Sequence, residues 1–172
     1  MAQKQFDAAD VEKRMKAGEQ LATVLGISDP QIEGLAALGY HAYEQGQLKN
    51  AETFFGGVTA LDNRSYVGWA GLGAVELAKR PQNLEAAHGY LSKAAELRPD
   101  DGTIQANLGE VLLRQGKLDE AKTHFEKAFQ LDPKRKDPGV NRARALVAGL
   151  DVVVKRAEQR QKAQEKTMAK AS

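Results

Sequence analysis

Two stretches of this chain, GYHAYEQGQLKNA at residues 39–51 and GEVLLRQGKLDEA at residues 109–121, carry Gly, Gly and Ala at the same three places. The two copies lie 70 residues apart, close to twice the 34-residue period of one family of helix–turn–helix repeats. A third, weaker copy lies between them, with two extra residues. The spacing therefore predicts three consecutive helix pairs over residues 32–65, 66–101 and 102–135.

The small residues of each repeat predict a close crossing of two helices. One glycine of the first helix is expected to face one alanine of the second, because two backbones approach closely only where both side chains are small. These pairs are Gly39 with Ala51, Gly73 with Ala87, and Gly109 with Ala121. Gly46 and Gly116 are expected to end first helices, where glycine adopts a positive φ without strain. Pro99 and Pro133 are expected to stop second helices.

These positions, together with Phe55 and Phe125 as fillers between neighbouring pairs, resemble the tetratricopeptide repeat (TPR). We therefore predict an all-α TPR solenoid of three helix pairs. An open array has to cover its apolar ends. Residues 1–31 are expected to supply an N-terminal helix, and residues 136–172 a long C-terminal capping helix.

Two features depart from the repeat. Gly56 and Gly57 lie inside a predicted helix, where each costs roughly 1 kcal/mol relative to alanine. They either allow a close contact with the N-terminal helix or are a tolerated weakness. The inserted RPQN at residues 80–83 is either a surface loop or a partner contact.

The composition argues against catalysis. The chain has no cysteine, which excludes disulfides, thiolate nucleophiles and cysteine–zinc sites. His41, His88 and His124 fall in different repeats without zinc-ligand spacing, so we expect packing or surface roles for them. Gly71 and Gly73 resemble a phosphate loop only superficially, because they lie within a helix. We expect no enzyme activity, no cofactor and no metal.

The N-terminal residues contain no apolar run typical of a signal peptide, and no segment is apolar enough to span a membrane. We therefore expect a soluble, cytoplasmic protein.

The concave face of a TPR array, lined by the first helix of each pair, is the candidate site. Small residues leave room for a guest's side chains, and tyrosines offer apolar area with a polar tip. The residues expected there are Ala36, Tyr40, Tyr43, Glu44, Ala70, Ala74, Leu77, Asn107, Glu110, Leu113 and Arg114. The predicted guest is an extended or helical peptide with apolar anchors. Alternatively, Tyr40 and Tyr43 merely pack against the neighbouring helix.

The segment from Gly18 to Leu77 resembles the class II type III secretion chaperones, which hold translocator proteins before export. The resemblance rests on the order of an N-terminal helix, a break at Ile27-Ser28, LGYHAYEQGQLKNA, an F…LD helix and WAGLGA. It implies a groove that holds an extended segment of a membrane-inserting translocator. It also implies a homodimer through the N-terminal helix, with Val11, Met15 and Leu21 as candidates. The inserted RPQN and the long basic C-terminal helix depart from that family.

Three functional hypotheses follow. The first is a chaperone-like protein that shields an apolar segment of a client, and the second is a constitutive TPR scaffold or adaptor. A third, weaker one is a nucleic-acid binder acting through residues 155–172, where six basic and two acidic side chains give a local charge of +4. We regard a solvated helix end as the better explanation of that charge.

Overall fold

The structure, a computed structural model, describes the backbone of residues 7–171 and the side chains of residues 7–157 and 159–162. Within this part the chain folds entirely into helices connected by short turns. Their bounds are α1 Ala8–Lys16, α2 Leu21–Leu25, α3 Asp29–Glu44, α4 Leu48–Leu61, α5 Tyr66–Ala78, α6 Leu84–Leu97, α7 Gly102–Arg114, α8 Leu118–Leu131 and α9 Pro138–Ala171. The prediction of three helix pairs between flanking helices is confirmed.

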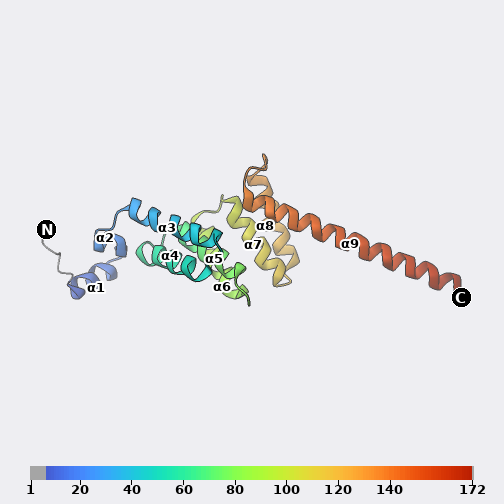
Figure 1. Ribbon diagram of the computed structural model, residues 1–172, viewed down its shortest axis with the longest axis horizontal. Coiled ribbons are helices and arrows are strands. Elements are labelled where there is room, and N and C mark those ends of the chain that lie inside the picture. Colours follow the sequence, from blue (N-terminus) through green and yellow to red (C-terminus); the bar gives the residue numbers. More distant parts are fainter. Residues whose placement is uncertain (1–6, 172) are drawn as a thin grey trace.

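The pairs α3/α4, α5/α6 and α7/α8 stack along the length of an elongated molecule, with the N-terminus at one end and α9 projecting from the other (Figure 1). The turns inside the first and third pairs contain the predicted glycines. Gly46 has a φ of 71° and Gly116 a φ of 79°, in the left-handed region that favours glycine. The pairs are thus closed by residues that the repeat pattern identifies.

The close helix crossings differ in one detail from the prediction. A Cβ added at Gly39 would lie 2.8 Å from the ring of Phe55, and one at Gly109 would lie 2.7 Å from the ring of Phe125. The nearest neighbour of each glycine is therefore a large side chain of the second helix, where the sequence predicted an alanine. Gly71 of α5 also contacts the ring of Phe55, which is inserted between α3 and α5.

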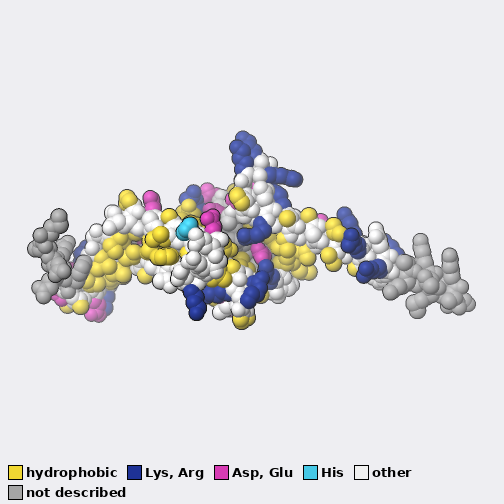
Figure 2. Space-filling model, viewed as in Figure 1, with side chains coloured by type: hydrophobic (Ala, Val, Ile, Leu, Met, Phe, Trp, Pro, Cys, Tyr) yellow, Lys and Arg dark blue, Asp and Glu magenta, His cyan; other side chains and the backbone are white. Residues whose placement is uncertain are grey.

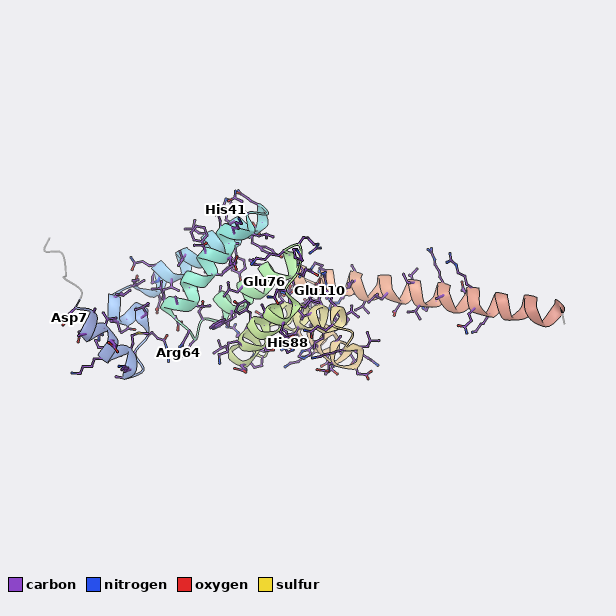
Figure 3. The ribbon with its side chains drawn as sticks, turned by 90° about the horizontal axis from the view of Figure 1, so that it is seen from below. Asp7, His41, Arg64, Glu76, His88 and Glu110 are labelled. Carbon is purple, nitrogen blue, oxygen red and sulfur yellow. The ribbon has the colours of Figure 1, made fainter. Side chains whose placement is uncertain are left out.

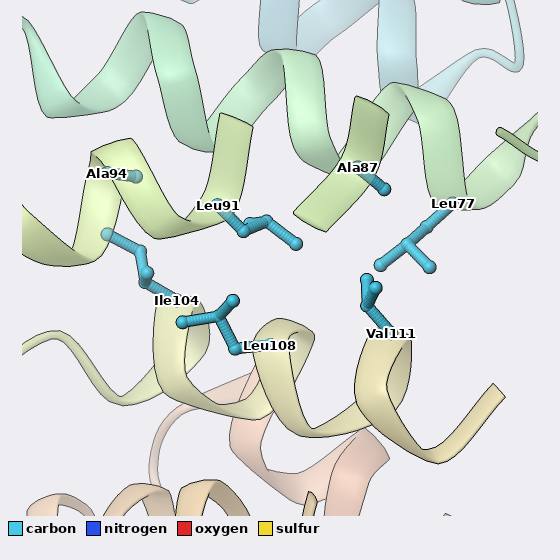
Figure 4. Close-up of a cluster of buried hydrophobic side chains, with 7 residues drawn as sticks. All are labelled: Leu77, Ala87, Leu91, Ala94, Ile104, Leu108 and Val111. Carbon is cyan, nitrogen blue, oxygen red and sulfur yellow. The ribbon is translucent and has the colours of Figure 1, made fainter. Parts of the chain in front are cut away.

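Each junction between pairs has its own apolar core. The central cluster joins α5, α6 and α7, with Leu77 and Leu91 facing Ile104, Leu108 and Val111 across the interface (Figure 4). A second cluster joins α3, α4 and α5, and a third joins α7, α8 and α9. Because these clusters share helices, the array is one continuous packed body.

Trp69, the single tryptophan of the chain, lies between the first two clusters and packs against both. Its ring stacks on Tyr90 at a centroid distance of 6.0 Å. Its indole N–H donates a hydrogen bond of 2.9 Å to the carbonyl oxygen of Asn63. This side chain therefore connects the first repeat to the second.

The N-terminal segment forms two helices, where the sequence predicted one. The chain breaks after α1 at Gly18, whose φ is 88°. Arg14 then pairs with Glu19 across the break at 2.5 Å. The side chain of Gln20 bonds the side chain and backbone of Asn63 at 3.1 Å, which fastens α2 to the first repeat. None of the residues of α1 is buried, so α1 has little contact with the array.

Helix α9 covers the last repeat with its first half. Val140 is completely buried and contacts the α-carbon region of Gly102, and Ala143 packs beside it. Arg144 binds Asp132 at 2.9 Å and its backbone oxygen at 2.6 Å, which joins α9 to the end of α8. Beyond residue 150 the helix leaves the body of the protein (Figure 1).

The two irregular features have structural explanations. A Cβ at Gly57 would lie 3.0 Å from the side chain of Leu35, so this glycine allows α4 to approach α3 closely, and not the N-terminal helix. Gly56 has open space around it, which fits a tolerated weakness. In the inserted segment, Gln82 accepts a hydrogen bond of 2.5 Å from Arg114, so the insertion contacts α7.

Candidate functional site

The inner helices α3, α5 and α7 lie side by side and form the candidate concave face. Tyr40 is its most prominent aromatic residue, with 48% of its surface exposed. Its ring meets the ring of Phe55 edge-on at a centroid distance of 5.2 Å, which fixes its orientation. Partial burial, followed by the nearby Tyr66 and Asp101, raises the pKa of the Tyr40 hydroxyl. The hydroxyl is thus neutral at physiological pH and can donate a hydrogen bond.

Four further predicted residues keep some exposure on α3 and α5. Tyr43 is half-buried and packs against the cluster of α3, α4 and α5, which agrees in part with the alternative interpretation of the tyrosines. Glu44 is exposed, and Ala70 and Ala74 are half-buried. Ala70 and Ala74 thus add small side chains on α5 to a face that has Tyr40 and Tyr43 on the neighbouring α3.

Ala36 and Leu77 do not offer the expected accessible surface. Ala36 is 8% exposed and Leu77 7% exposed, and Leu77 belongs to the central apolar cluster. The prediction of an accessible Leu77 was wrong because the side chain turns toward α6 and α7. It stabilises the array and cannot contact a guest in this conformation.

The third repeat differs more strongly, because α9 lies against the inner face of α7. Arg142 of α9 donates a hydrogen bond of 2.6 Å to the side-chain oxygen of Asn107. Its guanidinium also lies 3.9 Å from Glu110, whose side chain is only 13% exposed. Asn107 itself is 3% exposed. The predicted accessibility of Asn107 and Glu110 is therefore wrong: the chain's own C-terminal helix covers them.

The last two predicted residues have other partners. Arg114 pairs with Glu110 on its own helix and with Gln82 from the inserted segment. Leu113 is half-buried and lines a groove between α8 and α9. Neither residue lies free beside Tyr40. Apart from Arg114, which is exposed at the end of α7, the predicted residues that stay accessible therefore lie on α3 and α5.

The three histidines do not come together at one place, although His88 and His124 line the same pocket. His41 at the end of α3 and His88 on α6 lie well apart (Figure 3). His124 binds the side-chain oxygen of Gln105 at 2.8 Å, and burial, followed by Lys127 and His88, lowers its pKa. Among residues 7–157 and 159–162, the acidic and histidine side chains form no cluster of three or more that could hold a metal ion. No helix in the described chain is long and apolar enough to cross a membrane.

Residues 103–135 match the model of the tetratricopeptide repeat, and they coincide with the third helix pair. The chain therefore contains a tetratricopeptide repeat at this place. The other two pairs have helices of similar length, 13 to 16 residues, and the first pair also has a turn glycine with a positive φ. The TPR fold predicted from the sequence is thus confirmed.

Several solved structures share this fold. A type III secretion complex from Aeromonas hydrophila matches over 88% of this TPR chain and 98% of its own, with a TM-score of 0.67 and 24% identity. The translocator chaperone SycD of Yersinia enterocolitica matches over 76% and 98%, with a TM-score of 0.63 and 24% identity. PcrH, solved with the chaperone binding region of PopB, matches over 70% and 97%, with a TM-score of 0.60 and 27% identity.

A curated relative is a much longer protein. DnaJ homolog subfamily C member 3 of Bos taurus is 32% identical over 125 residues, which is 73% of this chain. The TPR chain spans only 20% of the length of that relative. The similarity therefore concerns only a part of that relative.

Proposed function

We propose that this TPR protein holds an extended or helical segment of a client protein on the concave face of α3 and α5, in the manner of a type III secretion translocator chaperone. The observation that carries the proposal is the exposed ring of Tyr40 on α3, with the partly exposed Ala70 and Ala74 on the neighbouring α5. Such a surface accommodates apolar anchor residues of a guest. The proposed action is binding without turnover, in the cytoplasm.

Two further observations support this proposal. PcrH, at 27% identity, was solved with the chaperone binding region of PopB, which shows that a similar array holds a segment of another protein. In the present chain α9 covers the third repeat. The guest is therefore expected to contact the first two repeats, and its anchors to lie close to Tyr40 and Tyr43.

The test is co-purification with proteins encoded near this chain. We expect one partner at a stoichiometric ratio, bearing membrane-inserting segments and more soluble when the two are expressed together. The double variant Tyr40→Ala/Tyr43→Ala should lose this partner, because it removes the aromatic anchors. The variant Tyr40→Phe keeps the ring and should retain most of the binding.

A matched control lies on the outer helices, where Thr53 of α4 and Lys93 of α6 are exposed. The variant Thr53→Ala/Lys93→Ala should bind like the unmodified protein. Circular dichroism of each variant excludes unfolding as the cause of a loss. If the tyrosine variant kept its partners, and these were folded proteins, the chain would act as a scaffold and the proposal would be wrong.

A further inference from the structure

The middle of α9 has apolar side chains on every side of the helix. From residue 145 to residue 154 the chain reads ALVAGLDVVV, in which Asp151 is the single polar side chain. One face of α9, which begins with the buried Val140 and Ala143, covers the last repeat. A helix that is apolar all round is normally buried in a protein. The opposite face of this segment therefore lacks a cover in the single chain.

This opposite face, here called the outer strip of α9, consists of small and β-branched residues at helical spacing. Its exposed members are Ala145, Ala148, Gly149, Val152 and Val153. Val153 is 65% exposed. Arg156 and Arg160 follow Val152 at intervals of four residues, so they extend the same face. Figure 2 shows hydrophobic side chains on the first part of α9 and basic ones further along.

The open concave face has the complementary pattern. One stripe of α3, with residues at intervals of three and four, exposes Glu33, Ala37, Tyr40 and Glu44. An apolar centre is thus flanked by a carboxylate on each side. Helices α3 and α5 together have four acidic residues and no lysine or arginine. The described part of α9 after Val154, in contrast, exposes Lys155, Arg156, Arg160 and Lys162.

We propose that the concave face of α3 and α5 receives the outer strip of α9 from a second copy of this chain. The inference rests on the proposed function, because it gives the same face a second occupant of the same chemistry. The apolar part of the strip lies over Tyr40 and the alanines of α5, and its two arginines reach the carboxylates of Glu33 and Glu44. In this assembly α9 occupies the groove until a client displaces it.

The dimensions and the charges agree with this contact. Ten helical residues extend over about 15 Å, and neighbouring packed helices lie about 8–10 Å apart. The apolar segment is therefore long enough to cross α3 and α5 together. At the α7 end the face carries Arg114 and Arg142, and the side chain of Arg142 is 54% exposed. Because these arginines repel a basic segment, the incoming helix runs from α5 toward α3.

The occupant is not α9 of the same chain. Helix α9 starts against α7 and continues as one helix, away from α3, to the opposite end of the molecule (Figure 1). A second copy that lies alongside in the opposite direction brings its α9 over the first copy from α7 toward α3. The exchange is then reciprocal, and the assembly closes as a two-fold dimer.

The chain has no cysteine, so pairs of single-cysteine variants report the contact directly. Val153→Cys is mixed either with Ala37→Cys, on the proposed receiving face, or with Thr53→Cys, on the exposed side of α4. Tags of different size identify the mixed disulfide. Under mild oxidation at micromolar concentration, we expect the pair with Ala37→Cys to form at least about tenfold faster, because the contact raises the effective concentration of the thiols. Equal rates, or a faster disulfide between two Val153→Cys chains, would overturn the proposal.

Sedimentation of the full chain tests the charges. The variants Glu33→Lys/Glu44→Lys and Arg156→Glu/Arg160→Glu should each raise the dissociation constant of the dimer by at least about tenfold, since like charges then meet across the contact. An equimolar mixture of the two variants should dimerise as tightly as the unmodified protein, because each face meets a tail of opposite charge. A mixture as weak as its components contradicts the contact.

The variant Val153→Glu separates this inference from the proposed function. It should dissociate the dimer, because it puts a carboxylate into an apolar contact, while the client still co-purifies. An unmodified chain that stays monomeric, but loses its client in Tyr40→Ala/Tyr43→Ala, refutes the dimer and leaves the proposed function standing. A monomer whose α9 binds vesicles containing phosphatidylserine also refutes it, in favour of a membrane surface.

Discussion

The ring of Phe55 lies between α3 and α5. Each of these helices has a glycine where it meets the ring. Gly39 contacts it from α3 and Gly71 from α5. Each glycine therefore sets a helix-to-helix spacing that a methyl group would increase. The repeat pattern identified Gly39, but not Gly71, because the close approach of Gly71 depends on the packing of one repeat on the next.

The first prediction concerns this contact. Gly71→Ala should destabilise the protein by about 1–3 kcal/mol, because overpacking moves α5 away from Phe55. Gly34→Ala is the matched control: Gly34 is exposed in α3, and an added methyl there meets nothing within 4 Å. This control should stabilise the protein by roughly 0.5–1 kcal/mol. Urea unfolding measures both, and equal effects would contradict the packing argument.

The second prediction concerns Asp132, which joins α8 to α9. The hydrogen bond from Arg144, and then the backbone N–H groups of Lys136 and Asp137, lower the pKa of its carboxyl group. A lowered folded-state pKa gives stability that is present above the unfolded value of about 3.9 and is lost as the pH falls through the folded value.

Asp132→Asn removes this charge. The difference in unfolding free energy between Asp132→Asn and the unmodified protein should therefore be constant from pH 7 to about pH 5, and should shrink below about pH 4. Denaturation by urea over this pH range measures it. A difference independent of pH would mean that the Arg144 contact does not stabilise the ionised form.

Among the elements, α9 both covers the apolar end of the last repeat and contacts polar residues of α7. The sequence predicted the first contact and not the second. The helical spacing of the apolar residues predicted a capping helix, and α9 does cover the last repeat. Its lateral position was not predictable, because it depends on Arg142 reaching Asn107 and Glu110 of α7. A local pattern specifies which face of a helix is apolar, but not which neighbour its polar side chains meet.

The third prediction tests the capping half of α9. Val140→Ala should lower the free energy of unfolding by about 1.5–3 kcal/mol, because it removes buried apolar atoms and leaves a cavity beside Gly102. Val152→Ala, in the part of α9 that has left the body, should change it by no more than about 0.5 kcal/mol. Thermal unfolding followed by circular dichroism compares the two variants.

At the scale of the whole molecule, the periodic features were the predictable ones. The helix order recurs in all three copies and the turn glycine in two of them, so these features are supported by more than one copy. The extent of the open concave face was not predictable, since Leu77 turns into the core and α9 covers Asn107. The break at Gly18 was also missed, because the apolar spacing continues across it.

The fourth prediction concerns the distribution of stability along the array. Helices α5 to α7 contain the central cluster, whereas α1 has no buried residue. Amide hydrogen exchange should therefore be slowest in α5–α7 and fastest in α1, since exchange follows local opening. Mass spectrometry of peptides after timed exchange measures this order. Uniform protection from α1 to α7 would contradict the weak attachment of α1.

Trp69 is an intrinsic fluorescent probe of the junction between the first and second repeats. Its indole ring stacks on Tyr90 between the first and second repeats, far along the chain from α9. Tryptophan emission therefore registers the opening of that one junction, whereas circular dichroism registers the melting of every helix. If the two signals change at the same denaturant concentration, the repeats unfold as a single unit. If the emission changes at a different denaturant concentration from the circular dichroism, the repeats unfold one after another. The emission wavelength then reports the separation of the first repeat from the second.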